Sequence, residues 1–435
     1  MSSQQQSELE FDPKPEDRSV VRHNIRVNNM HGIWESLALN LYSPFLGLLA
    51  IRLGASNFQV ALITALPAAV SSVASLAGAA FLRLFERKKS AACWLIMANR
   101  AFLLAIAALP LIPQEKQAWV FVGLVALMNV PGAISHIAWQ SLVADTIPKE
   151  YRGDAFAERS RLVTAVGIIP ALLGGYLCDS MSFPIGYQLV FVAAFLVSLV
   201  EVSVLSKFRE PRRVGNPPAA GGGSLDPEAG RPTLAQVLAN RGYVSFTLKA
   251  MIFYLGWMMS QPLFTIYYVR VLECGSLWVA VFSVVASIAR YLSFPKWSRR
   301  AAKKGNAWAL AAATAGMALT PVMVAMSPWA WLVAVFNVSM GYFTSGTTLL
   351  MLNTLLEMVP EKNRTSFIAY HNSAVNLSSF IGPILGKTLV DSFDIYWALG
   401  ISAMIRAAGS IGFFLLARTL MSDRRHTGAR GGESL

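Results

Sequence analysis

Long apolar stretches recur along almost the whole chain, with short polar connections between them. Each is about 20 residues long, enough to cross roughly 30 Å of hydrocarbon as a helix. Lipid cannot form hydrogen bonds with backbone N–H and C=O groups, so a chain that crosses it must pair these groups internally. Segments of alternating polarity, typical of membrane barrels, are absent, so helices are expected. The pattern predicts twelve of them, over residues 28–51, 57–82, 91–113, 118–144, 159–179, 185–206, 244–269, 276–298, 305–326, 328–356, 366–390 and 395–417.

One connection, residues 207–243, is much longer than the others. Pro, Gly and Ser dominate its middle, which is typical of a flexible linker, and Thr233 is placed to cap a short helix before the seventh span. We therefore expect an all-α membrane protein of two six-helix bundles. The predicted parts are a disordered cytoplasmic N-terminus (1–27), a first bundle (28–206), a cytoplasmic linker (207–243), a second bundle (244–417) and a cytoplasmic tail (418–435).

One motif occurs in both halves, as DTIPKEYRG at 145–153 and EMVPEKNRT at 357–365. In both copies an acidic residue is followed by Pro at the third position after it and by Arg at the seventh position after it. The two prolines lie 212 residues apart, close to half of the 435-residue chain. A duplicated helical half in an apolar chain is typical of transporters built from parallel repeats. The repeated charges are Asp145, Arg152, Glu357 and Arg364.

Composition agrees with a membrane protein: 54% of residues are hydrophobic, 14% are charged, and the mean hydropathy is +0.48. The net charge of +13 reflects topology rather than nucleic-acid binding. Alternate connections, the helix ends next to them and both termini hold 29 of the 37 Lys and Arg residues. This asymmetry predicts cytoplasmic termini in a multi-pass protein of the plasma (inner) membrane, with weak attraction to anionic lipid.

With these motifs, residues 26–420 resemble the major facilitator superfamily. The paired acid-x-x-Pro-x-x-x-Arg motif resembles that of its sugar porters, and IRLGASNFQVALITALP (51–67) resembles the junction of its first two spans. The resemblance implies a monomer whose bundles rock about a midplane site, with the repeated charges as a cytoplasmic gate. Leu82 and Phe85 depart from the usual motif after the second span, and Pro170 lies in a broken antiporter motif, so a drug/proton antiporter is not well supported.

Ionisable residues deep in a span are costly and usually face a cavity or a partner. His31 and Glu35 lie one turn apart on the first predicted helix, and Tyr42 continues that face. A carboxylate removed from bulk water can exchange protons near neutral pH, and an adjacent imidazole can modulate it. We therefore expect Glu35 and His31 to serve proton coupling. A structural pair near the cytoplasmic end of this span is the alternative.

Polar and aromatic stripes along several later spans predict a substrate cavity. Amide and aromatic walls suit a partly apolar organic ligand, although the same residues can join helices together or face lipid. In the superfamily, spans 1, 4, 7 and 10 line the cavity. The candidate substrate-binding residues are Tyr42, His136, Gln140, Tyr254, Trp257, Gln261, Arg290, Asn337 and Asn376.

Arginines indicate the substrate's charge. Arg290 lies past the midpoint of the eighth predicted span, and guanidinium binds carboxylate or phosphate through two hydrogen bonds. Arg100 and Arg406 lie in spans that usually support the cavity, so internal pairing or snorkelling is expected for them. Glu35 and Glu201 are the only clear acids within spans. An organic anion or amphiphile is therefore slightly favoured.

Several chemistries lack sequence support. GPILGKT (382–388) has the wrong spacing for a phosphate-binding loop, and no HExxH, GxSxG or CxxC motif occurs, so neither an enzyme nor a metal or other cofactor is expected. Three cysteines are too few for a disulfide framework, although Cys178 and Cys274 both lie near the predicted outer face. The sequence thus favours a proton-coupled secondary transporter of a small organic molecule. The alternatives are a multidrug or lipophilic-cation exporter, or a non-transporting receptor of the same fold.

Overall fold

The computed structural model describes residues 15–82, 85, 87–210, 234–360 and 364–431. These residues form helices and connections, with no strand in any of the five ranges. The helices of the first half are α1 (Pro15–Tyr42), η1 (Ser43–Phe45), α2 (Leu46–Arg52), α3 (Asn57–Phe81), α4 (Lys88–Ala107), η3 (Leu109–Leu111), α5 (Gln114–Thr146), α6 (Lys149–Val166), α7 (Ile168–Ser180) and α8 (Ile185–Leu205).

The second half repeats this alternation of long helices. Its elements are α9 (Leu234–Ala239), α10 (Arg241–Ile266), the π-helical η4 (Tyr267–Val271), α11 (Ser276–Lys304), α12 (Asn306–Ala318), α13 (Thr320–Ala325), α14 (Ala330–Met358), α15 (Arg364–Ser392) and α16 (Ile395–Gly431). Each of the twelve ranges predicted as spans is helical over most of its length. The short predicted helix before the seventh span is α9.

Several spans consist of two consecutive helices. Gly167 separates α6 from α7, and Leu319 separates α12 from α13, two residues before Pro321. Proline has no N–H, so Pro321 cannot bond the carbonyl of Met317 one turn earlier. Arg406 of α16 donates to that carbonyl instead, at 2.9 Å. The break therefore forms part of the packing between α12, α13 and α16.

The first helix begins earlier than predicted. Residues 15–27 are helical rather than disordered, and α1 runs from Pro15. Proline is tolerated in the first turn of a helix, where its missing N–H is not needed. Asn24 is buried and fixes this segment, because its side chain donates to the carbonyl of Arg209 (3.1 Å) and accepts from the N–H of that residue (3.0 Å). The predicted N-terminal and linker boundaries therefore shift, and residues 1–14 and 211–233 lie outside the described ranges.

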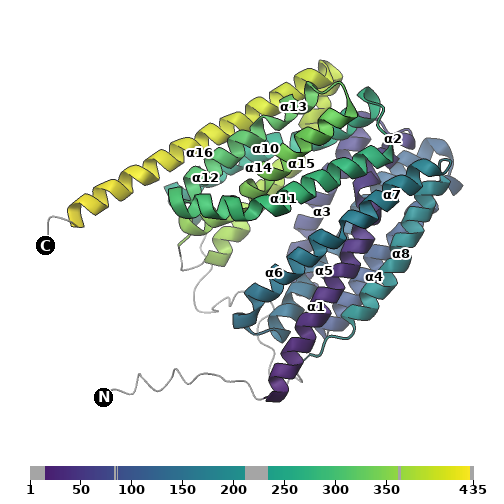
Figure 1. Ribbon diagram of the computed structural model, residues 1–435, viewed down its shortest axis with the longest axis horizontal. Coiled ribbons are helices and arrows are strands. Elements are labelled where there is room, and N and C mark those ends of the chain that lie inside the picture. The colour runs from purple at the N-terminus through teal and green to yellow at the C-terminus, as the bar shows by residue number, and fades with distance from the viewer. Residues whose placement is uncertain (1–14, 83–84, 86, 211–233, 361–363, 432–435) are drawn as a thin grey trace.

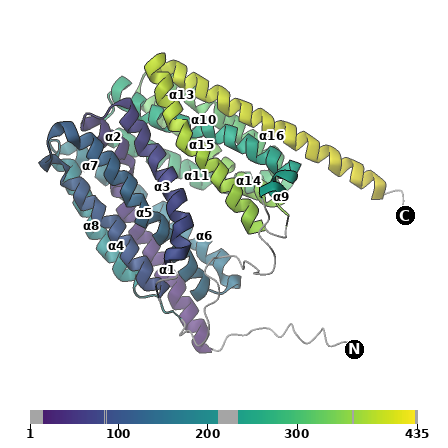
Figure 2. The same cartoon turned by 180° about the vertical axis from the view of Figure 1, so that it is seen from behind.

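The helices form two bundles that meet at one end and diverge at the other (Figures 1 and 2). The diverging end carries both described termini, Pro15 of α1 and Gly431 of α16. Where the bundles meet, α7 packs against α11, and α3 packs against α15. We call these the terminus side and the far side of the molecule. The structure therefore has its halves apart on the terminus side and joined on the far side.

Close backbone contact joins the halves at the far side. A Cβ atom on Gly175 of α7 would lie 2.9 Å from the Ser276 carbonyl oxygen and 2.9 Å from the Ala280 Cβ, both on α11. Tyr187 of α8 shares a hydrogen bond with the Ser276 hydroxyl at 2.9 Å. Between α3 and the second half, Asn57 donates to Asp391 at 2.9 Å. A glycine at 175 is thus required for this approach of the two bundles.

Eight helical segments of the described chain are long and apolar enough to cross a membrane, judged by length and composition. The helices α1, α10, α14 and α15 are not among them. These four carry amide, hydroxyl and charged side chains along their length, including most of the polar stripes predicted from sequence. Three of these helices, α1, α10 and α14, correspond to the first, seventh and tenth predicted spans, for which the sequence predicts a cavity-lining role.

Candidate functional site

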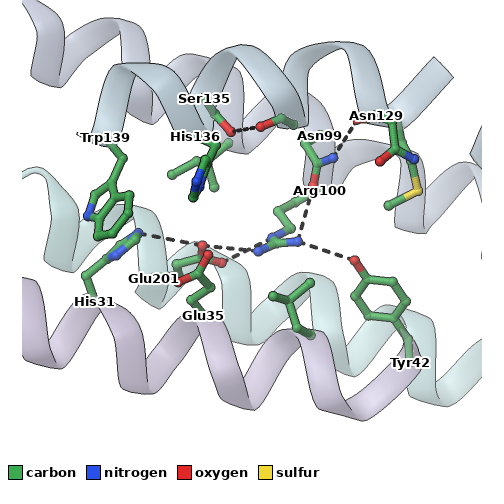
Figure 3. Close-up of a pocket in the computed structure, with 14 residues that line it drawn as sticks. His31, Glu35, Tyr42, Asn99, Arg100, Asn129, Ser135, His136, Trp139 and Glu201 are labelled. Atoms are coloured by element: carbon green, nitrogen blue, oxygen red, sulfur yellow. Dashed lines mark hydrogen bonds and ion pairs between the residues drawn. The ribbon is translucent and has the colours of Figure 1, made fainter. Parts of the chain in front are cut away.

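A polar cavity of about 250 Å³ lies within the first bundle, between α1, α4, α5 and α8 (Figure 3). Of the residues predicted from sequence, it is lined by His31, Glu35, Tyr42 and His136. Asn129, Arg100 and Glu201 also line it. The close spacing of ionisable groups in an apolar bundle distinguishes this cavity, since such groups are costly to bury unless they are paired.

Arg100 and Glu201 form a bidentate ion pair at the back of the polar cavity. The guanidinium Nε and Nη2 atoms lie 3.1 and 3.2 Å from the two carboxylate oxygens, and both side chains are buried. Nη1 of Arg100 also donates to the Tyr42 hydroxyl at 3.3 Å and to the Asn99 side-chain oxygen at 3.2 Å. Arg100 thus pairs internally, as predicted, and both charges are fully compensated.

Glu35 is paired with Arg159, a residue that sequence analysis did not select. Nη2 of Arg159 donates to the Glu35 carboxylate, and its Nη1 donates to the backbone carbonyl of Asn28 at 2.6 Å. Arg159 is buried, whereas the Glu35 side chain is 31% exposed. The pair joins α1 to α6, and its carboxylate is the part that water can reach.

His31 lies between these two ion pairs. Its Nδ1 is 3.3 Å from Nη1 of Arg159, and its Nε2 is 3.7 Å from a carboxylate oxygen of Glu201, beyond hydrogen-bond distance. Nε2 has no hydrogen-bond partner among the described residues, although the side chain is buried. Trp139 covers this region, with the Arg159 guanidinium 4.6 Å from its ring centre. The imidazole therefore lies between a partly exposed acid–base pair and a buried one.

A second cavity, of about 300 Å³, lies mainly in the second bundle between α10, α11 and α14. It is lined by three predicted residues, Gln261, Arg290 and Asn337, together with Phe264 and Tyr268. Asn337 is buried and donates to the Val333 carbonyl at 2.9 Å, which holds its side chain at the cavity wall. We call this the C-half cavity.

The other four predicted substrate residues line neither the polar cavity nor the C-half cavity. Gln140 is exposed and lies 3.0 Å from His136. Tyr254 and Trp257 have ring centres 5.2 Å apart and pack beside Phe253 against the core of the second bundle. Asn376 is half-buried on α15. Aromatic stripes can serve helix packing as well as binding, and Tyr254 and Trp257 make packing contacts here.

Arg406 is enclosed by neutral oxygen atoms. Besides the carbonyl of Met317, its guanidinium contacts the Gly256 carbonyl at 3.3 Å, the Thr320 hydroxyl at 2.9 Å and the Ser260 hydroxyl. The side chain is fully buried. Arg406 therefore packs inside the second bundle as expected, and it fastens α16 to α10, α12 and α13.

The repeated motif occupies equivalent positions in the two halves, at the junctions of α5 with α6 and of α14 with α15. In this conformation its side chains contact their own half. Asp145 pairs with Lys88 at 2.7 Å, Arg152 donates to the Ile147 carbonyl at 2.7 Å, and Glu357 accepts from Asn306 at 2.8 Å. The Arg364 side chain lies outside the described part of the chain. These three contacts stay within one half, which agrees with bundles that are apart on the terminus side.

No group of three or more potential metal ligands occurs among the described residues. The cysteines Cys93, Cys178 and Cys274 are free thiols, so the two cysteines near the far side are not bridged in this structure.

Comparison with known proteins gives a consistent result. The sequence model of the Major Facilitator Superfamily matches residues 34–304 and 251–434. No curated protein matches the chain. A bacterial homologue of the human lysosomal transporter Spinster, solved in an inward-facing and unoccupied conformation, has a TM-score of 0.63 at 14% identity, over 94% of this chain and 99% of its own.

The nucleoside transporter NupG, solved as a point mutant, has a TM-score of 0.68 at 10% identity, over 90% of this chain and 99% of that one. At these identities the two structures establish the fold and not the ligand. The fold of the matched family implies twelve membrane spans, the number predicted from the apolar pattern. The chain belongs to the Major Facilitator Superfamily.

Proposed function

We propose that this transporter moves a small organic molecule across the plasma (inner) membrane by alternating access, coupled to protons. Both termini are assigned to the cytoplasm. The halves are joined on the far side by α7–α11 and α3–α15 contacts and separate on the terminus side. This conformation corresponds to an inward-facing state, and the outward-facing state requires these contacts to break and the terminus side to close.

The observation that carries the coupling proposal is the pairing of Glu35 with Arg159. The two carboxylates of the polar cavity differ in access: Glu201 is 1% exposed and Glu35 is 31% exposed. A buried, bidentate pair is poorly suited to exchange protons, whereas a carboxylate at a cavity wall can gain and lose them. We therefore assign coupling to Glu35, with His31 as the neighbour that modulates it, and a supporting role to Glu201.

Protonation of Glu35 would act on the packing of α1 and α6. It removes the negative charge that compensates Arg159, which is buried and held by the Asn28 carbonyl. An uncompensated buried guanidinium is unfavourable, so the two helices should rearrange or the carboxylate should be recharged. Because α6 continues through Gly167 into α7, which contacts α11, this change can reach the joint between the halves.

Charge compensation also bears on the substrate. Both acids of the polar cavity face arginines, which leaves no free carboxylate there for a cationic ligand. Arg290 lines the C-half cavity with Gln261 and Asn337, and its guanidinium has no ion-pair or hydrogen-bond partner within the described ranges. These features favour an organic anion or amphiphile over a lipophilic cation. The role of the repeated charges as a gate that closes the terminus side is part of the same proposal.

A ligand screen and a flux assay test the proposed function. Purified protein is screened by thermal shift against matched panels of organic anions and cations at two pH values. A ligand at 100 times its Kd should stabilise the protein by about 2.7 kcal/mol. The best anion is then tested for accumulation in proteoliposomes with an imposed pH gradient. Binding without flux would identify a receptor of this fold, and hits confined to cations would favour an exporter.

A further inference from the structure

A groove of about 910 Å³ runs between the two halves, along α6 and α7 of the first bundle and α11 of the second. It is the largest of the three cavities described for this chain. Its wall combines hydroxyl groups with large apolar side chains. Arg290, Ser283 and Ser287 line both this groove and the C-half cavity, so the two spaces adjoin at Arg290.

Two arginines from opposite halves line the groove: Arg161 on α6 and Arg290 on α11. Arg161 lies twelve residues after Lys149, where α6 begins, and Arg290 lies fourteen residues before Lys304, where α11 ends. At 1.5 Å per residue, these positions are about 18 and 21 Å from the terminus-side ends of their helices. The two side chains thus occur at similar depth on facing helices.

Neither arginine is compensated by the protein. No acidic residue lines the groove, and among the described residues neither guanidinium has a hydrogen bond or an ion pair. Glu158 lies three residues before Arg161 but forms no ion pair with it in the described structure. By contrast, Arg100 and Arg159 each bind a carboxylate. Both arginine side chains are exposed and line the groove, so they form a positively charged wall that an anion entering the groove can reach.

The remainder of the groove offers an apolar surface beside this charge. Tyr291, Leu292 and Phe294 follow Arg290 on α11 and are all exposed, and Ile168 lines the facing wall on α7. A small hydrophilic anion would leave this surface uncovered. A ligand with one anionic headgroup and an apolar chain would use both parts of the groove, since removal of apolar area from water is favourable.

We propose that Arg161 and Arg290 together bind the anionic headgroup of an amphiphilic substrate, whose apolar part lies against Tyr291, Phe294 and Ile168. This inference rests on the proposed transport function and specifies its substrate class. Arg161 is then a specificity-determining residue that the sequence did not single out. Because the arginines repel each other and belong to different halves, a bound anion also lowers the cost of bringing the halves together on the terminus side.

The test measures binding to full-length protein in nanodiscs of neutral lipid, so that it needs no flux. The probes are dodecyl phosphate, dodecyltrimethylammonium with the same chain, and methyl phosphate with the same headgroup. We expect dodecyl phosphate to bind at least about tenfold more tightly than either control, since the ammonium probe lacks the hydrogen bonds to the arginines and methyl phosphate lacks the apolar chain. Repeating the titration in nanodiscs with anionic phospholipid distinguishes the headgroup source: competition indicates a bilayer lipid, and its absence a free amphiphile.

Three variants make the assignment specific. Arg161→Gln and Arg290→Gln should each raise the Kd for dodecyl phosphate about tenfold, and the double variant should lose less than the two effects combined, as expected for one shared headgroup. Arg161→Lys should retain part of the affinity. Arg299→Gln, at an exposed position of α11 outside the groove, is the matched control and should bind like the wild type.

Unchanged affinity in Arg161→Gln, or equal binding of the ammonium probe, would overturn the inference while leaving pH-driven transport of another ligand untouched. If the wild-type protein binds dodecyl phosphate through both arginines but transports nothing in the flux assay, the result would instead count against the transport function. The assignment of the binding site would still hold.

Discussion

Asp179 at the end of α7 accepts a hydrogen bond of 2.9 Å from the backbone N–H of Ser276, the first residue of α11. Its second carboxylate oxygen accepts from the N–H of Leu277 at 2.8 Å. The first N–H groups of a helix have no partner within the helix, so a carboxylate there satisfies two of them. Its negative charge also interacts favourably with the positive end of the helix dipole. Here the cap comes from the opposite half of the protein. The contact therefore stabilises the conformation in which the far side is closed.

Removal of this cap should open the far side more often. Asp179→Ala should cost the closed form about 1 kcal/mol, the usual contribution of a helix cap. A change of this size shifts the ratio of closed to open molecules by a factor of about five. Distances between spin labels on α7 and α11, measured in nanodiscs, would report the change as a larger population at long separation.

The matched control for this cap is Asp394→Ala. Asp394 accepts from the N–H of Ile395 at 2.6 Å, and so caps α16 within one half. Its loss should lower thermal stability without altering the distance between α7 and α11. Equal distance distributions for Asp179→Ala and the wild type would show that the cap does not hold the halves together.

The contact at Gly175 gives a second, independent test of the far side. A methyl group there would come within 3.0 Å of α11 at both Ser276 and Ala280, so Gly175→Ala should force α7 and α11 apart. We expect slower transport and increased labelling of cysteines placed on the far side. Gly123→Ala on α5 is the control, because outside its own turn of helix nothing lies within 4 Å of the new methyl group. That variant should be neutral or stabilising by up to about 1 kcal/mol. Normal transport by Gly175→Ala would mean that this contact is not needed in the cycle.

Stability should depend strongly on Arg100 and Glu201. Arg100→Met leaves Glu201 buried without a counter-ion, and loss of one partner of a buried pair typically costs about 3–5 kcal/mol. The double variant Arg100→Met with Glu201→Gln should recover much of that loss, because no buried charge remains. Melting temperatures in detergent would measure both effects.

The exposed pair of Lys387 and Asp391, with a 2.8 Å separation, serves as the reference for this comparison. Lys387→Ala should change stability by under about 1 kcal/mol. A double variant that is no more stable than Arg100→Met alone would argue that the pair is needed for more than charge compensation.

Periodicity and duplication were sufficient to predict the architecture. The apolar runs predicted each span, because the hydrocarbon thickness fixes how many residues a crossing helix needs. The repeat at Asp145 and Glu357 correctly placed two equivalent helix junctions. The start of α1 was mispredicted, because residues 15–27 are polar and are held by contacts to Arg209 that lie far away in the sequence.

The site was only partly predictable, for a related reason. Glu35, His31 and Tyr42 share one helix face, so helical spacing alone placed them together. Their partners come from other helices: Arg159 lies 124 residues from Glu35, and Arg100 lies 101 residues from Glu201. Arg159 and Arg161 also lie near a basic loop, where positive charge is expected from topology alone. Arg159 lies ten residues after the start of α6, and a basic residue this far from the loop was the signal that could have identified it.

The most direct test of the account is pH-driven flux by Glu35→Gln in proteoliposomes, with the anion selected by the thermal-shift screen. Glutamine keeps the size of the side chain and a hydrogen-bond acceptor for Arg159 but cannot exchange a proton. We predict that the variant binds the anion and exchanges it between the two sides at a rate near that of the wild type, while accumulation driven by a pH gradient is lost. Full pH-driven accumulation by Glu35→Gln would contradict the account and remove Glu35 from the coupling mechanism.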